Sequence, residues 1–159
     1  MENTSKMKSP GVYIPPPLFY VLTFLIAIFL QKRIPLPEGF FQTSVARILG
    51  YIFILMSLYF LWRSLRQFFL TRNTVITVKP ATSLQTTGVY AITRNPMYLG
   101  LVILYIGIAL LIGNWWNFLL LIILTIFLQE YLIKREERYL MDAFGAAFEA
   151  YCSKTRRWI

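Results

Sequence analysis

The sequence contains no histidine and a single cysteine, Cys152. The absence of histidine excludes a Ser-His-Asp triad, a histidine-ligated metal ion and a proton shuttle through imidazole. One cysteine supports neither a disulfide framework nor a cysteine-rich metal site, so we expect no metal centre. Any chemistry must therefore use carboxylates, arginines, tyrosines and backbone groups, or a cofactor that is already reactive.

Charged residues are also scarce. They make up 14% of the chain, against about a quarter of an average soluble domain. Hydrophobic residues make up 57%, and the mean hydropathy is +0.58. Runs without any charged residue cover residues 9–31, 48–62 and 95–129. A water-soluble monomer is therefore not expected, and the runs are interpreted as membrane spans.

The third of these runs is too long for one span. As a single helix, residues 95–129 would be roughly 52 Å long, whereas the hydrocarbon core of a bilayer is about 30 Å thick. Gly113-Asn114 is the strongest turn signal in this run, and it predicts a tight hairpin between two helices. The sequence thus predicts an all-α integral membrane protein with four transmembrane helices, at about 15–31, 44–68, 95–112 and 115–131.

The remaining stretches give weaker signals. The first run has a cleavable signal peptide as its alternative interpretation, but Gln31-Lys-Arg33 follows it where a small-residue cleavage site would be needed. The stretch 71–87 is rich in threonine and valine and contains a proline, so we expect an extended cytosolic connection there. No repeat of fixed period appears, and the whole chain, 1–159, is interpreted as one membrane domain.

The basic residues are distributed unevenly between the two sides of the predicted bundle. Four spans put both termini on one side, and of the 16 basic residues only Lys32, Arg33 and Arg47 lie on the other. The positive-inside rule makes the basic side cytoplasmic, so we expect a bacterial inner-membrane protein with both termini in the cytoplasm. The net charge of +9 then reflects topology and attraction to anionic lipids. Binding of nucleic acid is not expected, because no basic face stands apart from the membrane flanks.

A polar segment, residues 88–100, leads into the third span. Pro96 is placed in the first turn of that helix, and Asn95 is the expected N-cap. In the structural interpretation, Arg94 and Tyr98 simply anchor the helix at the interface. In the functional interpretation, free N–H groups at the helix N-terminus beside an arginine form an anion site.

A second polar segment follows the fourth span and predicts an amphipathic cytosolic helix at about 132–153. Glu137 falls within its apolar stripe and Glu136 at the edge, and a carboxylate on a buried face is costly unless it is paired. Glu137 either pairs with Arg94 or another basic residue for structure alone, or helps to hold a cationic ligand. The stripe consists of Ile133, Leu140, Phe144, Phe148 and Tyr151.

Short motifs occur in both polar segments in a specific order. They are Gly88-x-Tyr90, Thr93-Arg-Asn-Pro-Met-Tyr-Leu-Gly100, Arg135-Glu-Glu137, Phe144-Gly145, Tyr151 and Arg156-Arg-Trp158. Together they resemble the membrane methyltransferase family that includes isoprenylcysteine carboxyl methyltransferases and phospholipid N-methyltransferases, over roughly the C-terminal half. The family often has Arg-His-Pro where this chain has Arg94-Asn95-Pro96. Asparagine keeps hydrogen bonding possible but cannot titrate near neutrality, which argues against proton transfer at this position.

The resemblance implies S-adenosylmethionine as the methyl donor, bound where the two polar segments meet. It implies a lipophilic acceptor in the membrane, such as an isoprenylcysteine carboxylate, a phospholipid amine or another small nucleophile. The donor's cations suit aromatic faces and carboxylates, and its leaving group is a neutral thioether, so alignment and exclusion of water suffice. The implied catalytic residues are Arg94, Glu137 and Arg156, with Arg156 and Arg157 as candidates to hold an anionic part of the acceptor. The implied donor-binding residues are Tyr90, Arg94, Asn95, Pro96, Tyr98, Leu99, Gly100, Glu136 and Glu137.

Other functions stay open at the level of sequence. A nicotinamide-dependent membrane reductase uses a related architecture, and a non-enzymatic membrane adaptor is a further alternative. A transporter is least expected, because the spans lack an ionisable residue at mid-depth. No residue type decides which acceptor is methylated. Four short spans have little interior, which leaves pairing with a second copy of the chain open.

Overall fold

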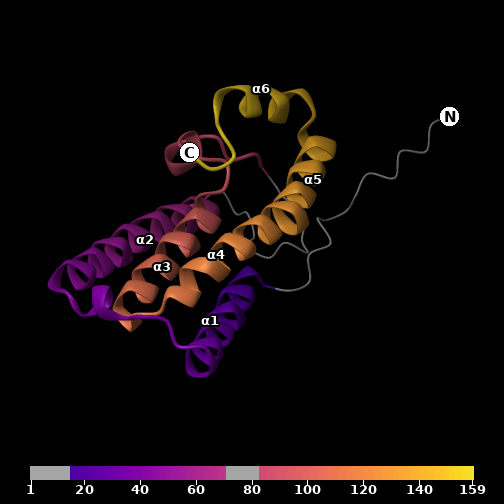
Figure 1. Cartoon of the computed structure of the whole chain (residues 1–159). Coiled ribbons are helices and arrows are strands. Elements are labelled where there is room, and N and C mark those ends of the chain that lie inside the picture. The colour runs from indigo at the N-terminus through magenta and orange to yellow at the C-terminus, as the bar shows by residue number, and fades with distance from the viewer. Residues whose placement is uncertain (1–14, 71–82) are drawn as a thin grey trace.

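The protein is described by a computed structural model over residues 15–70 and 83–159, and every regular element within these ranges is helical (Figure 1). Of the predicted connection at 71–87, residues 71–82 lie outside the described ranges, and 83–87 contain no helix. The elements are α1 (Pro16–Arg33), η1 (Gly39–Gln42), α2 (Ser44–Leu70), η2 (Gly88–Ala91), α3 (Pro96–Ile112), α4 (Trp115–Leu128), the π-helical turn η3 (Gln129–Ile133), α5 (Lys134–Phe144) and α6 (Ala146–Lys154).

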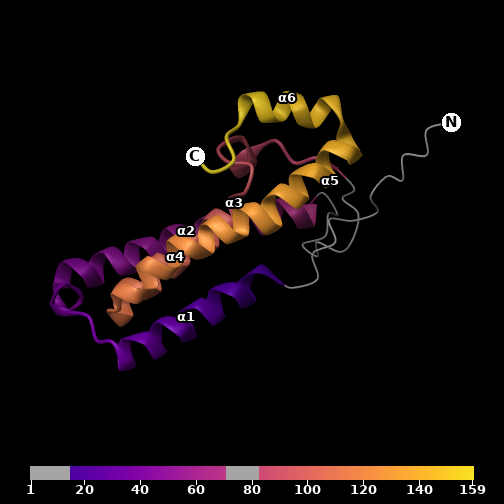
Figure 2. The ribbon, with the colours of Figure 1, turned by 45° about the vertical axis from the view of Figure 1, so that its right-hand side comes forward.

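The four helices at the predicted spans form an elongated bundle. α3 and α4 lie between α2 and α1, and α5 continues the line of α4 while α6 turns back across that end of the molecule (Figures 1 and 2). The ends of α1 to α4 fall within about three residues of the predicted bounds, as hydrophobic runs locate long helices better than their ends. The predicted helices are therefore present, and the polar segments meet at one end of the bundle.

Small residues let α2 and α3 approach closely. A Cβ atom added to Gly107 would lie 2.9 Å from the carbonyl oxygen of Gly50, and one added to Gly100 would lie 2.9 Å from Cγ of Leu61. The hydroxyl of Ser57 donates to the carbonyl oxygen of Gly100 at 2.8 Å. Close contact of backbones through small residues and interhelical hydrogen bonds is the usual way in which helices associate in membranes.

The predicted break at Gly113-Asn114 is confirmed. Gly113 adopts the left-handed conformation, with φ 79°, at the end of α3. The side chain of Asn114 caps α4 by accepting a hydrogen bond from the backbone N–H of Trp116 at 2.8 Å, and its amide donates to the carbonyl oxygen of Ala27 at 2.9 Å. The turn therefore closes the α3–α4 hairpin and also ties it to α1.

The prediction of one separate amphipathic helix at 132–153 was wrong in two respects. The helix is continuous with the fourth predicted span, as one helix over Trp115–Phe144. It then breaks at Gly145, whose φ of +50° and ψ of −125° suit glycine and not residues with a side chain. Phe148 and Tyr151 are buried as predicted, but they belong to α6, which has folded back, and not to a stripe shared with α5.

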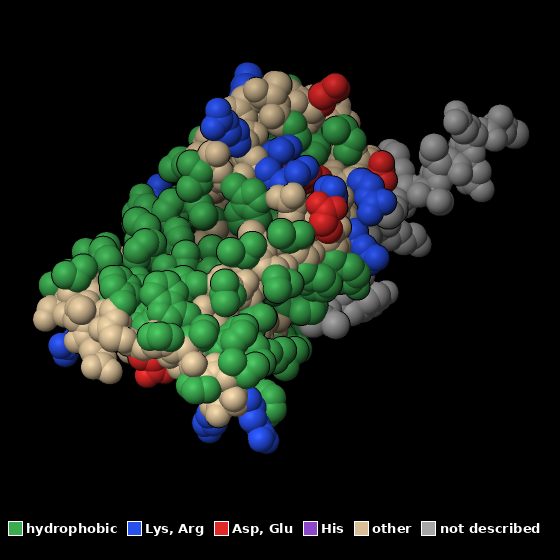
Figure 3. Space-filling view, viewed as in Figure 1, with side chains coloured by type: hydrophobic (Ala, Val, Ile, Leu, Met, Phe, Trp, Pro, Cys, Tyr) green, Lys and Arg blue, Asp and Glu red, His purple; other side chains and the backbone are tan. Residues whose placement is uncertain are grey.

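The surface of the bundle is that of a membrane protein. Among the described residues, α2 and the continuous helix Trp115–Phe144 are long and apolar enough to cross a membrane, and α3 is a shorter apolar helix. Large hydrophobic side chains stand exposed along α2, such as Leu55 and Trp62, each 67% exposed. Figure 3 shows hydrophobic side chains covering most of one face, with charged side chains gathered toward its two ends. An exposed apolar face of this kind is typical of a surface in contact with lipid.

Candidate functional site

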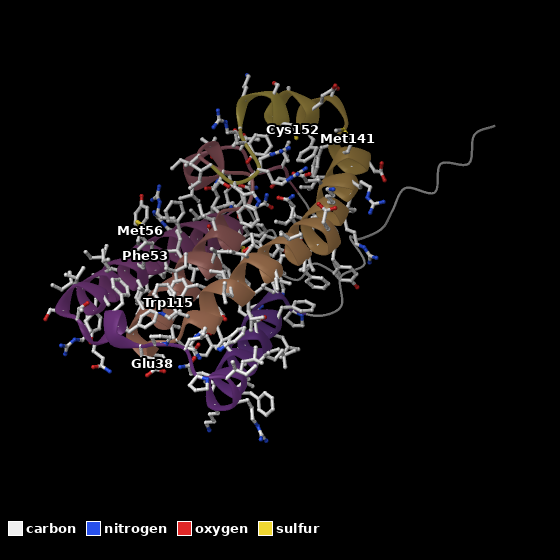
Figure 4. The ribbon with its side chains drawn as sticks, in the orientation of Figure 1. Glu38, Phe53, Met56, Trp115, Met141 and Cys152 are labelled. Carbon is white, nitrogen blue, oxygen red and sulfur yellow. The ribbon has the colours of Figure 1, made fainter. Side chains whose placement is uncertain are left out.

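A cavity of about 620 Å³ opens at the polar end of the bundle, where the start of α3 meets α5, α6 and the residues that follow α6. Met141 and Cys152 lie near each other at this end, far from Glu38 and Trp115 at the other (Figure 4). The cavity thus lies beyond the apolar part of the bundle, next to its membrane-facing surface. Its lining consists of Arg94, Glu130, Lys134, Glu137, Arg138, Met141, Phe148, Cys152 and Arg157.

The carboxylate of Glu137 is the centre of an ion-pair network in this cavity. Its Oε1 accepts a hydrogen bond from Nε of Arg157 at 3.0 Å and lies 3.4 Å from Nη1 of Arg94, and its Oε2 is 2.6 Å from Nη2 of Arg157. The side chains of Glu137, Arg94 and Arg157 are 16%, 15% and 31% exposed. The hydrogen bonds that Arg157 donates to Glu137 raise the pKa of its guanidinium. Glu137 thus pairs with Arg94, as one of the two sequence-based interpretations expected, and also with Arg157.

Arg94 is held in place through its main chain and its side chain. Its backbone N–H donates to the carbonyl oxygen of Arg156 at 2.9 Å, and Nη1 also contacts the sulfur of Cys152. Its Nε is buried and has no hydrogen-bond partner among residues 15–70 and 83–159. A buried donor without a partner is costly, so this atom is a candidate for binding an acceptor atom of a ligand.

Of the predicted donor-binding residues only Arg94 and Glu137 line the cavity, and the other seven do not. The carbonyl oxygen of Tyr90 accepts a hydrogen bond from the hydroxyl of Tyr151 at 2.6 Å, and burial raises the pKa of both phenols. The hydroxyl of Tyr98 donates to Oε1 of Glu136 at 2.8 Å, which binds the start of α3 to α5. Three predicted residues are buried in the packing of α3: Pro96, Leu99 and Gly100.

Asn95 occupies the expected position before α3, but the expectation that its side chain caps the helix was wrong. Its amide Nδ2 instead donates to the carbonyl oxygen of Arg157 at 2.9 Å, while its backbone N–H donates to the hydroxyl of Thr93 at 3.2 Å. The side chain is turned away from the helix because the chain after α6 passes beside it and offers an acceptor.

The two adjacent arginines near the end of the sequence lie in different surroundings. Arg156 is exposed and contributes its carbonyl oxygen to Arg94, whereas the guanidinium of Arg157 enters the cavity. The structure therefore brings together Arg94, Glu137 and Arg157, and leaves the side chain of Arg156 outside this network.

Several cavity residues were not predicted from the sequence. Lys134 and Arg138 fall outside the motifs described above, and Cys152 served only to exclude disulfides and a cysteine-rich metal site. They line the cavity together with Met141 and Phe148 because α6 folds back over α5. The Phe144-Gly145 pair was the available signal for this reversal. Within the described ranges, no cluster of three or more histidine, cysteine, aspartate or glutamate side chains could hold a metal ion.

Comparison with known proteins gives one family. A family model described as phospholipid methyltransferase matches residues 45–147, which include α2 to α5 and the start of α6. Arg94 and Glu137 fall within the matched range, whereas the residues after Lys154 fall outside it.

Two curated proteins are similar to parts of the chain. Protein-S-isoprenylcysteine O-methyltransferase of Schizosaccharomyces pombe is 40% identical over 73 residues, which are 45% of this chain and 30% of the yeast enzyme. An uncharacterized protein of Haemophilus influenzae is 36% identical over 63 residues, which are 40% of this chain and 100% of that protein. The chain thus spans about a third of the length of the yeast enzyme. No solved structure matches it.

Proposed function

Since the chain belongs to the phospholipid methyltransferase family, we propose that it transfers a methyl group from S-adenosylmethionine to a lipophilic acceptor carried in the membrane. The observation that carries this proposal is the meeting of Arg94, from the start of α3, with Glu137 of α5 in one cavity beside the apolar bundle. Both residues lie in motifs that the resemblance to membrane methyltransferases had singled out.

The residues of the cavity fit such a donor chemically. Arg94 offers a buried Nε that has no hydrogen-bond partner within the described part of the chain, which suits the carboxylate of an amino acid. A carboxylate has about four acceptor sites. Three guanidinium nitrogens contact the carboxylate of Glu137, which leaves one acceptor site for a further donor such as an ammonium or a ribose hydroxyl. Met141, which is 42% exposed, supplies apolar surface on which a purine can lie.

The sulfonium group of the bound donor supplies an activated methyl group and leaves as a neutral thioether, so the reaction needs no general acid. With the donor bound, the acceptor's lone pair would form the new bond to the methyl carbon while the carbon–sulfur bond breaks. The chain's own contribution is therefore to bind, orient and exclude water. The network around Glu137 fixes the guanidinium groups, and the buried ring of Phe148 closes one side of the cavity.

The position of the cavity supports a membrane-borne acceptor. It lies at the end of the bundle, so an acceptor can approach laterally from the bilayer while a water-soluble donor arrives from the aqueous side. We propose that α1 and α3 cross the membrane along with α2 and α4, because α1 packs on α4 and α3 packs along α2. The end with α5 and α6 then faces the cytoplasm of a bacterial inner membrane.

The proposal is tested by isothermal calorimetry of S-adenosylmethionine with the detergent-purified protein. We expect saturable binding to the wild type and binding at least about tenfold weaker for Glu137→Gln, the loss of one charge-assisted contact. Asp142→Asn removes an exposed carboxylate of the same helix and serves as the matched control, with unchanged affinity. A folded wild-type protein without affinity for the donor would contradict the proposed function, most clearly if it oxidised a reduced nicotinamide instead.

A further inference from the structure

The residues that follow α6, here called the strap (155–159), are tied to the segment before α3 through their main chain. The carbonyl oxygen of Arg156 accepts a hydrogen bond from the backbone N–H of Arg94 at 2.9 Å. The carbonyl oxygen of Arg157 accepts two, from Nδ2 of Asn95 at 2.9 Å and from the hydroxyl of Thr93 at 3.1 Å. Figures 1 and 2 both place the C end beside the segment that leads into α3.

Side chains tie the strap to a second part of the molecule. Arg157 forms a bidentate ion pair with Glu137 of α5, and Nε1 of Trp158 donates to Oε1 of Gln129 at 2.9 Å. The indole of Trp158 also packs against the hydrophobic core. The strap therefore bridges the start of α3 and the η3–α5 segment, and Arg157 forms part of the cavity wall.

Asn95 is the side chain that connects these two attachments. It is 8% exposed, it does not cap α3, and its Nδ2 reaches the carbonyl oxygen of the residue whose guanidinium reaches Glu137. We propose that Asn95 is a positioning residue: by holding the main chain of the strap, it places Arg157 against Glu137 and so completes the wall of the cavity. The effect on donor binding rests on the proposed function, whereas the attachment of the strap does not.

Without the side-chain amide of Asn95, the strap would lose one of its attachments to the segment before α3. The carbonyl oxygen of Arg157 would keep only the hydroxyl of Thr93, and an arginine side chain with many rotamers would no longer be directed at Glu137. Glu137 would then keep Arg94 as its one close cation among the described residues, and the cavity would open on the strap side. The family model ends at residue 147, so the strap lies outside the matched range.

The attachment is tested with trypsin on the full chain in detergent at pH 8. Cleavage after Arg156 or Arg157 releases the last residues, and mass spectrometry of these short peptides gives its rate. Asn95→Asp has nearly the same volume but replaces the amide donor with a second acceptor, so we expect release to be about tenfold faster than in the wild type. Asn95→His restores an N–H at a similar position, and its release should stay within about twofold of the wild type.

Two further variants keep this test decisive. Asn95→Leu removes the hydrogen bond without adding charge, and it too should release the strap about tenfold faster than the wild type. It replaces Asn95→Asp in the test if Asn95→Asp folds poorly. Ala147→Asp adds a negative charge at an exposed position of α6 and should leave the rate of release unchanged. If Asn95→Asp and Asn95→Leu are both folded by circular dichroism and release the strap no faster than the wild type, the proposal is overturned.

Donor kinetics distinguish positioning from direct chemistry. We expect Asn95→Asp to raise the KM for S-adenosylmethionine about tenfold, with kcat within about threefold and with rescue by Asn95→His. A collapse of kcat with an unchanged KM and a closed strap would overturn the proposal, because Asn95 would then act at the reacting atoms. If the wild type has no donor affinity but the cleavage pattern holds, the proposed function fails while the attachment of the strap by Asn95 is supported.

Discussion

At the residue scale, the mostly buried carboxylate of Glu137 faces two guanidinium groups, and its removal leaves both without their counter-ion. Breaking a buried pair costs more than the pair contributes, because the remaining charge stays desolvated. With Arg157 about one third exposed, water offsets part of that cost.

We therefore predict that Glu137→Gln lowers the free energy of unfolding by about 2 kcal/mol, measured by denaturation in detergent. Asp142→Asn, on the exposed side of the same helix, should change it by less than about 0.5 kcal/mol. Equal stability of Glu137→Gln and the wild type would show that the two arginines do not depend on this carboxylate.

Two of the residues in the cavity could be predicted from the sequence for a physical reason. A carboxylate inside an apolar stripe needs a partner, and an arginine before an Asn-Pro helix start is a natural candidate, so Glu137 and Arg94 were found. Arg156 and Arg157 could not be told apart, because which of two adjacent side chains faces the cavity depends on how the strap is held. That direction is set by Asn95 and Thr93, far away in the sequence.

At the scale of elements, the contact between α2 and α3 depends on glycines that admit no side chain. A Cβ atom on Gly107 would lie 2.8 Å from Cγ1 of Ile54 and 2.9 Å from the carbonyl oxygen of Gly50, and the backbone atom cannot move aside cheaply. The clash outweighs the better helix propensity of alanine.

Gly107→Ala should therefore destabilise the protein by about 2 kcal/mol. Gly39→Ala is the matched control, because an added Cβ atom meets nothing within 4 Å there, and it should be nearly neutral. Thermal melting of both variants in one detergent compares them, and equal melting temperatures would mean that α2 and α3 can separate without cost.

Long apolar helices and the α3–α4 turn could be predicted, because each has a strong local signal in hydrophobic runs or in Gly113-Asn114. The continuity of α4 with α5 could not, since the wide turn η3 has no sequence signature of its own and shifts which side chains face inward. The reversal at Gly145 was missed because helical periodicity before and after it happens to agree. These two local features place α6 over α5 and thereby form the cavity.

At the scale of the whole molecule, the number of membrane crossings decides whether the cavity and η1 lie on the same side of the membrane or on opposite sides. Glu38, directly before η1, and Glu149, in α6, are exposed at opposite ends of the described structure. If α2, α3 and α4 all cross, three spans separate these positions and they lie on opposite sides of the membrane. If α3 does not cross, two spans separate them and they lie on the same side.

We predict opposite sides. In a Cys152→Ser background, Glu38→Cys in intact spheroplasts should react with a membrane-impermeant maleimide, and Glu149→Cys should react only after lysis. Labelling of both in intact spheroplasts, or of neither, would rule out the four-span topology with a cytoplasmic cavity.

We expect the methyl donor to bind in the cavity between α5, α6 and the strap. A photoreactive analogue of S-adenosylmethionine, crosslinked to the detergent-purified protein and mapped by peptide mass spectrometry, tests this claim directly. We predict crosslinks in the peptides that contain Met141 and Phe148, lost when unlabelled S-adenosylmethionine is added in excess. Competable crosslinks confined to other parts of the chain would contradict the account.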